Sequence, residues 1–130
     1  MLVQKEQVFV ESARIDWTDL GGGVRRKVTA YSDALMSVYV EFQKGSVGAR
    51  HSHPHWQITY IQSGAFTVHI GAETRVLRGG DFYLIPAHVE HGVEALEDSV
   101  LVDFFAPMRE DFVPTSPGDA ALPAGEQGTP

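Results

Sequence analysis

Apolar residues alternate with polar ones at a period of two along most of this chain, and this alternation limits the fold more than any other feature. Between residues 35 and 42, the alternate positions are Met36, Val38, Val40 and Phe42. The same pattern recurs in residues 65–70, 82–85 and 100–105, and glycine-rich turn signals separate these segments. Such alternation is typical of strands with one buried face. Since no stretch has the repeat of an amphipathic helix, the sequence predicts an all-β sandwich or barrel, with a jelly roll as the leading candidate.

The length of 130 residues predicts a single domain. Composition changes at Pro114, beyond which Pro, Gly, Ala, Thr and Ser dominate. Such a segment buries too little surface to offset its ordering entropy. We therefore expect residues 1–113 to form the β-barrel and residues 114–130 to be a disordered tail. Residues 1–10 are expected to form an edge strand or an arm that crosses to a second subunit.

The formal net charge of −7 argues against nucleic acids and anionic membranes as partners, because both would repel an acidic surface. An anionic small substrate stays compatible, since a local cation can dominate its own pocket. The chain has no cysteine, which excludes disulfides and thiolate metal sites. No apolar run approaches the length of a membrane span, and residues 1–10 do not resemble a signal peptide. These features favour a cytoplasmic protein.

All six histidines lie between His51 and His91, and three of them fall within five residues. Residues two apart on a strand share one face. Four side chains of the same parity would therefore lie together: His51, His53, His55 and Gln57. Neutral imidazoles at this spacing can reach one metal ion, with an amide oxygen beside them. A solvated strand with incidental histidines is the alternative, and for an isolated His-x-His pair it is the better one.

A second block of sequence favours the metal site over the solvated strand. It runs from Gly80 to His91 and contains a turn, a buried strand, a proline and the last histidine. The two blocks together resemble the paired cupin motifs G-x5-H-x-H-x3-4-E-x6-G and G-x5-P-x-G-x2-H. This resemblance implies a single-domain cupin jelly-roll β-barrel that holds one divalent transition-metal ion. It also implies the ligands, which are His51, His53, Gln57 and His91.

Two positions depart from the cupin motifs: Gln57 stands where glutamate is usual, and His88 where glycine is usual. Three imidazoles and an amide are all neutral, so the ion would keep its full charge, which favours Lewis-acid chemistry over oxygen activation. These ligand types allow Ni, Fe, Mn, Co or Zn. We expect His55 to line the pocket or support the ligands, whereas the place of His88 at the pocket mouth is left open.

The end of the barrel contains a second candidate group. If Val102 and Phe104 face one way, then Asp103 and Phe105 face the other, into the barrel. A buried acid is costly unless it is paired or useful. Arg109 follows a proline turn and could reach back to bind a carboxylate with two hydrogen bonds. On pattern alone, two interpretations are equal: Asp103 and Arg109 are functional residues at the barrel mouth, or they form a structural salt bridge that closes the last strand.

The region 23–112 resembles the KdgF-type cupins, which are connected with pectin and alginate breakdown. The matching pieces include Gln57 and the ending Asp103-x-Phe105-x-Pro107-x-Arg109-Glu110-Asp111-Phe112. The resemblance implies an isomerase-type reaction, the linearisation of 4,5-unsaturated monouronates to open-chain ketouronates. Asp103 and Arg109 would be catalytic, while Phe105 and Arg109 would bind the substrate. Trp56 replaces an expected glutamate and would alter the pocket wall.

Two other functions stay open. Many cupins are metal-dependent dioxygenases, and others are non-catalytic modules that bind a sugar or a metal. For the assembly we predict a homodimer, because a small open barrel leaves strand edges and an outer sheet face that need cover.

Overall fold

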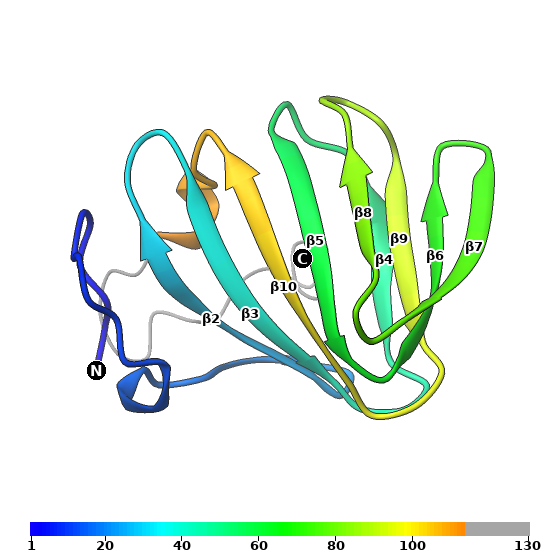
Figure 1. The fold of residues 1–130 in the computed structure, drawn as a ribbon, viewed down its shortest axis with the longest axis horizontal. Coiled ribbons are helices and arrows are strands. Elements are labelled where there is room, and N and C mark those ends of the chain that lie inside the picture. Colours follow the sequence, from blue (N-terminus) through cyan, green and yellow to red (C-terminus); the bar gives the residue numbers. More distant parts are fainter. Residues whose placement is uncertain (114–130) are drawn as a thin grey trace.

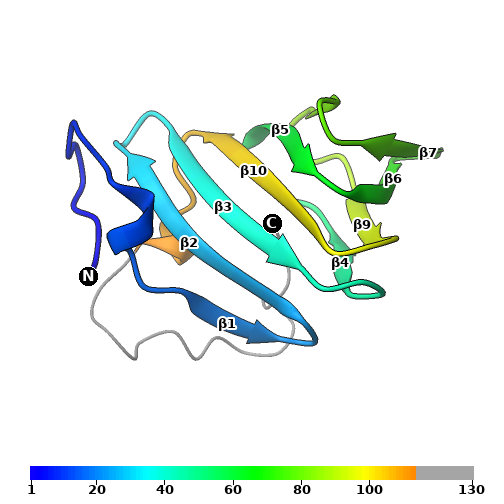
Figure 2. The same ribbon diagram turned by 60° about the horizontal axis from the view of Figure 1, so that its bottom comes forward.

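The computed structural model describes residues 1–113, and its regular secondary structure is almost entirely β-strand. The strands form a six-stranded sheet in the order β1-β2-β3-β10-β5-β8 and a four-stranded sheet in the order β4-β9-β6-β7. All pairings are antiparallel. Figures 1 and 2 show the two sheets facing each other in the jelly-roll arrangement, so the predicted all-β cupin fold is confirmed. The elements are η1 (Ser12–Arg14), β1 (Thr18–Gly21), β2 (Val24–Tyr31), β3 (Met36–Phe42), β4 (Val47–His51), β5 (Trp56–Ser63), β6 (Ala65–Ile70), β7 (Glu73–Arg78), β8 (Phe82–Ile85), β9 (His91–Ala95), β10 (Ser99–Ala106) and η2 (Glu110–Phe112).

The core lies between the sheets and follows the alternation of the sequence. On β3, Met36, Val38, Val40 and Phe42 are all buried, and the residues between them are half-buried. Phe42 meets Phe66 of the opposite sheet edge to face, with ring centroids 5.1 Å apart. On β10 the buried positions are Ser99, Leu101, Asp103 and Phe105, as the alternation predicts. The inner face of the large sheet therefore changes from aliphatic to polar toward one end.

The predicted edge strand within residues 1–10 is wrong, since the first strand begins at Thr18. The backbone N–H of Gln4 donates to the side chain of Gln7 at 3.0 Å, and Glu6 has a φ of +65°. The hydrogen bond and the left-handed conformation of Glu6 belong to a turn, which an extended edge strand cannot contain. Contact of this segment with a second subunit stays a prediction, and the predicted tail at 114–130 lies outside the described residues.

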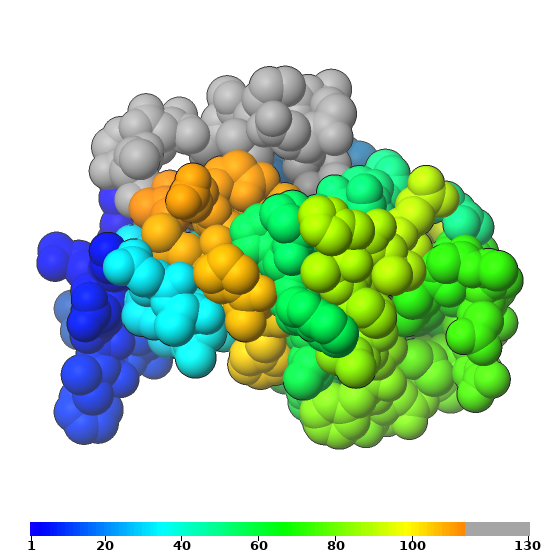
Figure 3. Space-filling model, turned by 90° about the horizontal axis from the view of Figure 1, so that it is seen from above, coloured from blue at the N-terminus to red at the C-terminus, as the bar shows by residue number. Residues whose placement is uncertain are grey.

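One end of the barrel collects the segments that carry the predicted site. At this end β4 passes into β5, β9 begins and β10 ends, and it lies at the top of Figure 1. Figure 3 looks onto this end and shows the end of β10 with the residues that follow it (orange) between the β2–β3 hairpin (cyan) and β5 (green). Among residues 1–113, no helix is long and apolar enough to cross a membrane.

Candidate functional site

Three histidines meet at this end of the barrel. His51 ends β4 and lies opposite His91, the first residue of β9, while His53 follows in the β4–β5 connection. The ring centroids of His51 and His91 are 4.3 Å apart, and those of His53 and His91 are 4.8 Å apart. One ring nitrogen from each histidine lies within 4.8 Å of the others. Residues from both sequence blocks thus form one cluster that could hold a metal ion.

The rings present the same edge to the centre of the cluster. Each Nδ1 is within hydrogen-bond distance of a backbone carbonyl: Ala49 for His51 (2.9 Å), His55 for His53 (3.1 Å) and Val89 for His91 (2.9 Å). A carbonyl accepts a hydrogen bond, so each Nδ1 is favoured as the protonated nitrogen, which leaves the lone pair on Nε2. Within residues 1–113, the buried Nε2 atoms of His51 and His91 have no hydrogen-bond partner.

Burial keeps these imidazoles neutral. It lowers the pKa of His51, His53 and His91 to about 4 in each case, with the charge of Arg109 as a further lowering influence. Neutral imidazole is the form that binds metal ions. The cluster is therefore ready for a cation throughout the neutral pH range.

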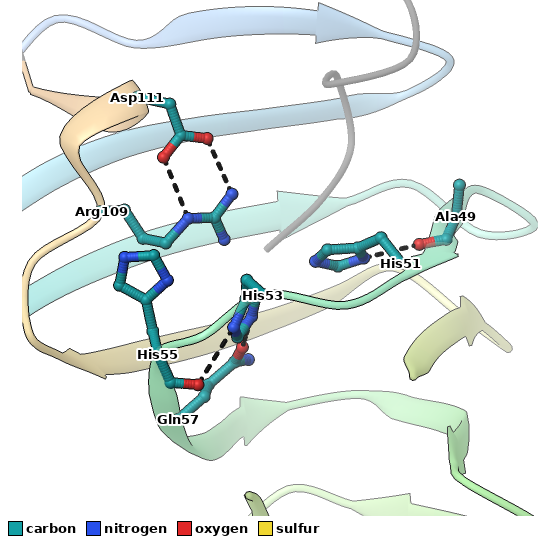
Figure 4. A network of polar contacts seen from close by, with 7 residues as sticks. All are labelled: Ala49, His51, His53, His55, Gln57, Arg109 and Asp111. Carbon is teal, nitrogen blue, oxygen red and sulfur yellow. Dashed lines mark hydrogen bonds and ion pairs between the residues drawn. The ribbon is translucent and has the colours of Figure 1, made fainter. Parts of the chain in front are cut away.

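Gln57, on β5, places its carbonyl oxygen beside this cluster (Figure 4). Its Oε1 lies 3.0 Å from Nε2 of His53. A neutral ring has one N–H, yet both nitrogens of His53 face an oxygen acceptor. One of the two ring nitrogens therefore directs a lone pair at an oxygen atom, which is unfavourable. A cation bound between Nε2 of His53 and Oε1 of Gln57 would remove this repulsion. The four predicted ligand residues therefore fit a divalent ion on the chemistry of their donor atoms.

Asp103 lies directly behind Gln57 and is fully buried. Its Oδ1 accepts hydrogen bonds from Nε2 of Gln57 (3.0 Å) and from Oγ1 of Thr59 (2.5 Å). Its buried Oδ2 has no hydrogen-bond partner among the described residues. Burial raises the pKa of Asp103 to about 7, against the lowering influence of Thr59, Arg109 and Gln57. A carboxyl group with such a pKa can take up or release a proton near neutrality.

Arg109 pairs with Asp111 and not with Asp103. Its Nε and Nη2 donate to the two carboxylate oxygens of Asp111 at 3.0 and 2.8 Å. The remaining Nη1 is buried without a hydrogen-bond partner in the described part of the chain, and Figure 4 shows it on the side toward His53. The expected alternative of a structural Asp103–Arg109 salt bridge is therefore wrong. The turn after β10 places Asp111, in η2, within hydrogen-bond distance of the Arg109 guanidinium.

Aromatic rings form the wall between these polar groups. Phe105 is buried, with its ring 5.6 Å from that of His53 and the guanidinium of Arg109 5.2 Å from its centroid. Phe112 lies between two guanidinium groups, at 3.7 Å from Arg26 and 4.1 Å from Arg109. This stacking holds two cations beside the site within an apolar setting.

Comparisons with known proteins agree with this geometry. A family model described as a cupin domain matches residues 38–105. The pectin degradation protein KdgF of Dickeya dadantii (strain 3937) is 46% identical over 99 residues, which cover 75% of this chain and 90% of the relative. The chain belongs to the KdgF family of cupins.

Two solved structures resemble this KdgF-family chain over most of their length. KdgF from Halomonas sp. superposes with a TM-score of 0.79 at 42% identity, covering 82% of this chain and 98% of that chain. An RmlC-like cupin from Shewanella frigidimarina NCIMB 400 superposes with a TM-score of 0.82 at 36% identity, covering 85% and 100%.

Three residues with open roles can now be placed in this KdgF-family site. His55 lines a cavity of about 590 Å³ that includes none of the four candidate ligands, and its ring lies 5.3 Å from that of His53, so its place on the wall of the metal site stays a prediction. His88 has a φ of +70°, the left-handed conformation for which the cupin motif uses glycine, and its N–H donates to the carbonyl of His53 at 2.7 Å. The expectation that Trp56 alters the pocket wall is wrong. Trp56 precedes the inward-facing Gln57 on β5, so it points outward and is 51% exposed.

Sequence reasoning missed three residues of this site. Thr59 has the same parity as Gln57, so the alternation already contained a signal for it. Asp111 lies in the ending that resembles KdgF-type cupins, but nothing local marks it as the partner of Arg109. Arg26 is buried on β2, far away in sequence, and only the fold brings it near Asp103.

Proposed function

We propose that this protein is a metal-dependent enzyme that linearises 4,5-unsaturated monouronates to open-chain ketouronates. The observation that carries the proposal is the convergence of a neutral metal-binding cluster, a buried carboxyl group and an arginine with an unpartnered Nη1 at one end of the barrel. The relationship to a pectin degradation protein supports the substrate class. A buried carboxyl group beside the histidine cluster, with its pKa raised to near neutrality, supports catalysis over binding alone.

We assign substrate binding to Arg109 and Phe105. The Nη1 edge of Arg109 offers donors to the carboxylate of the uronate, and planar guanidinium groups suit such two-point binding. Phe105 supplies an apolar surface for the sugar ring between Arg109 and His53. The net charge of the whole chain is −7, yet the groups beside the histidine cluster are neutral or cationic apart from Asp103 and Asp111. An anionic sugar acid matches that local charge.

We assign proton transfer to Asp103. As a base it would take the proton of the anomeric hydroxyl, after which the ring C–O bond breaks, C1 becomes an aldehyde and the negative charge lies on the enolate oxygen at C5. As an acid it would return a proton to C4, which converts the enolate to a ketone. The number of atoms and electrons is unchanged, as an isomerisation requires. The pKa of about 7 suits both steps.

The ion would be held by Nε2 of His51, His53 and His91 and by Oε1 of Gln57. When bound, it would supply Lewis-acid stabilisation to the oxygens of the substrate. Because all four donors are neutral, we propose a divalent ion from the group Ni, Fe, Mn, Co and Zn. The same neutrality disfavours the dioxygenase alternative, since no ligand carboxylate stabilises a higher oxidation state.

The decisive experiment follows the conjugated double bond by ultraviolet absorbance. Purified unsaturated monouronates prepared from pectin and from alginate are incubated separately with the metal-loaded protein. The expected result is loss of absorbance and formation of an open-chain ketouronate without oxygen uptake. Oxygen consumption would favour the dioxygenase, and binding without turnover would favour the non-catalytic module. The relative rates decide between galacturonate-derived and mannuronate- or guluronate-derived substrates.

We further propose that the protein is a cytoplasmic homodimer. The absence of cysteines is compatible with a reducing compartment. The outward positions of β5, β8 and β10 contain no charged residue, and Ile58, Phe82, Leu84 and Phe104 are each 45% or more exposed. Ile58 lies beside both Phe104 and Leu84 in the sheet, so this apolar face is continuous. A second copy with the same uncharged face would cover it without bringing two acidic surfaces together.

A further inference from the structure

The hydrogen bonds around Gln57 define the orientation of its amide. Thr59 donates its hydroxyl proton to Oδ1 of Asp103 at 2.5 Å. Its oxygen therefore presents lone pairs toward Gln57, 3.0 Å from Nε2, and Oδ1 of Asp103 is a second acceptor at 3.0 Å from the same nitrogen. The two acceptor oxygens lie only 2.5 Å apart on the same side of the amide nitrogen, so they share its N–H donation and hold the nitrogen on the Asp103 side. A flipped amide would set Oε1 against two oxygens in a fully buried position.

The same arrangement decides which atom reaches the histidines. With Nε2 held by Thr59 and Asp103, Oε1 faces Nε2 of His53 at 3.0 Å. An oxygen in this position can bind a cation, whereas an amide nitrogen cannot, because its lone pair is delocalised. Groups behind a ligand commonly orient it and tune metal affinity in this way.

We infer that Asp103 and Thr59 are positioning residues that require glutamine, and not the glutamate of the cupin motif, at position 57. A glutamate there would place two carboxyl groups about 3.0 Å apart in a buried site, where both cannot be ionised together, so one of them would have to hold a proton that glutamine makes unnecessary. The departure at position 57 and the buried acid at position 103 are therefore two parts of one hydrogen-bonded unit. The inference rests on the proposed function, because a bound ion is what the aimed oxygen serves.

The first experiment reverses the polarity of the pair. The variants are Gln57→Glu, Asp103→Asn and the double variant, and the readouts are the melting temperature without metal and the affinity for Ni²⁺ in competition with a chromophoric chelator. Gln57→Glu should lower both the melting temperature and the affinity. The double variant should recover both, because the amide introduced at position 103 then donates to the carboxylate introduced at position 57. Equal values for Gln57→Glu and the double variant would overturn the inference.

The second experiment removes the hydroxyl that holds the amide. Thr59→Val should weaken Ni²⁺ binding by about 10- to 100-fold, as is typical when a group behind a ligand is lost. Thr59→Ser keeps the hydroxyl and should bind Ni²⁺ almost as well as the wild type, whereas Thr67→Val on β6 is the matched control for the substitution itself. Wild-type affinity in Thr59→Val would contradict its positioning role.

These outcomes are separable from failure of the proposed function. If the wild type binds no Ni²⁺ and has no uronate activity, the proposed function fails. The metal-free melting temperatures of the polarity-reversal variants still test the pairing of Gln57 with Asp103. If the wild type is active but the double variant shows no recovery, only the inference about positioning fails.

Discussion

Arg109 and Asp111 form a two-point ion pair that uses one edge of the guanidinium and leaves Nη1 on the other side buried, with no hydrogen-bond partner among residues 1–113. Burial raises the pKa of Asp111, but the hydrogen bonds and the charge of Arg109 outweigh it and lower that pKa overall. Asp111 therefore stays ionised and holds the Arg109 side chain in place. The Nη1 side of the guanidinium then faces the histidines.

We expect Asp111→Asn to raise KM for unsaturated uronates about tenfold with a smaller change in kcat, because loss of a hydrogen bond to a charged group costs ~1.5 kcal/mol. Steady-state kinetics give both values, and Asp111→Glu should recover part of the loss. Glu110→Gln is the matched control, since it removes the same charge from the same turn without breaking the ion pair. A KM in Asp111→Asn no higher than in the control would contradict this role.

Asp103→Asn should reduce turnover about a hundred- to ten-thousand-fold, the usual cost of losing a general acid–base group. Metal content should stay intact, because the amide carbonyl introduced at position 103 can still accept from Gln57. Arg109→Ala should lower the rate and raise KM together, because both binding and orientation suffer. If either residue is merely structural, its variant will melt earlier and keep near-normal specific activity, so thermal melts accompany the kinetics.

Protein purified without a histidine tag should contain close to one divalent ion per chain. The double variant His53→Ala with His91→Ala should lose it, because two of the four neutral donors are removed. Elemental analysis provides the measurement. Unchanged metal content in the double variant would remove these histidines from the site.

The metal-free protein should lose stability as the pH falls from about 6.5 toward 4. Burial lowers the folded-state pKa of His51, His53 and His91 from 6.5 to about 4, so in this window the unfolded chain binds protons that the folded chain does not. Asp103 acts in the opposite direction, since its raised pKa of about 7 makes the folded state bind a proton between pH 7 and 4. Because three histidines lower the stability in this pH window and only Asp103 raises it, we expect a net loss of stability.

Thermal melts in the presence of a chelator test this balance. The melting temperature should fall across the window in the wild type and fall more steeply in Asp103→Asn, which lacks the opposing group. A flat profile, or equal slopes in the two proteins, would show that these buried groups do not govern the pH dependence.

Light scattering should give a mass of twice the 14.3 kDa of one chain at micromolar concentration. Phe82→Glu should shift the protein to monomer, because it places a charge in the uncharged outer face at a position that is 63% exposed. Val76→Glu on β7 is the control, as that residue is also exposed but lies on the other sheet. A wild-type monomer would exclude the dimer, and a dimeric Phe82→Glu would exclude this face.

The sequence by itself determined the class of fold and the candidate ligands. The alternation on residues 36–42 and 100–105 depends on neighbouring positions in one strand, so it predicts which side chains are buried without knowledge of the partner strands. The spacing of His51, His53 and Gln57 is local in the same sense. Parity alone also implies that Trp56 points away from Gln57, so the outward direction of that ring was within reach of the sequence.

The tertiary structure decided which distant residues meet. Asp103 lies opposite Thr59, and Phe105 opposite Gln57, because β10 pairs with β5 in one particular register, and a shift of a single residue would turn Asp103 out of the site. The choice of Asp111 over Asp103 as partner of Arg109 likewise depends on where the turn after β10 directs the chain. Cross-strand register depends on the assembly of the whole sheet, and no local pattern in the sequence encodes it.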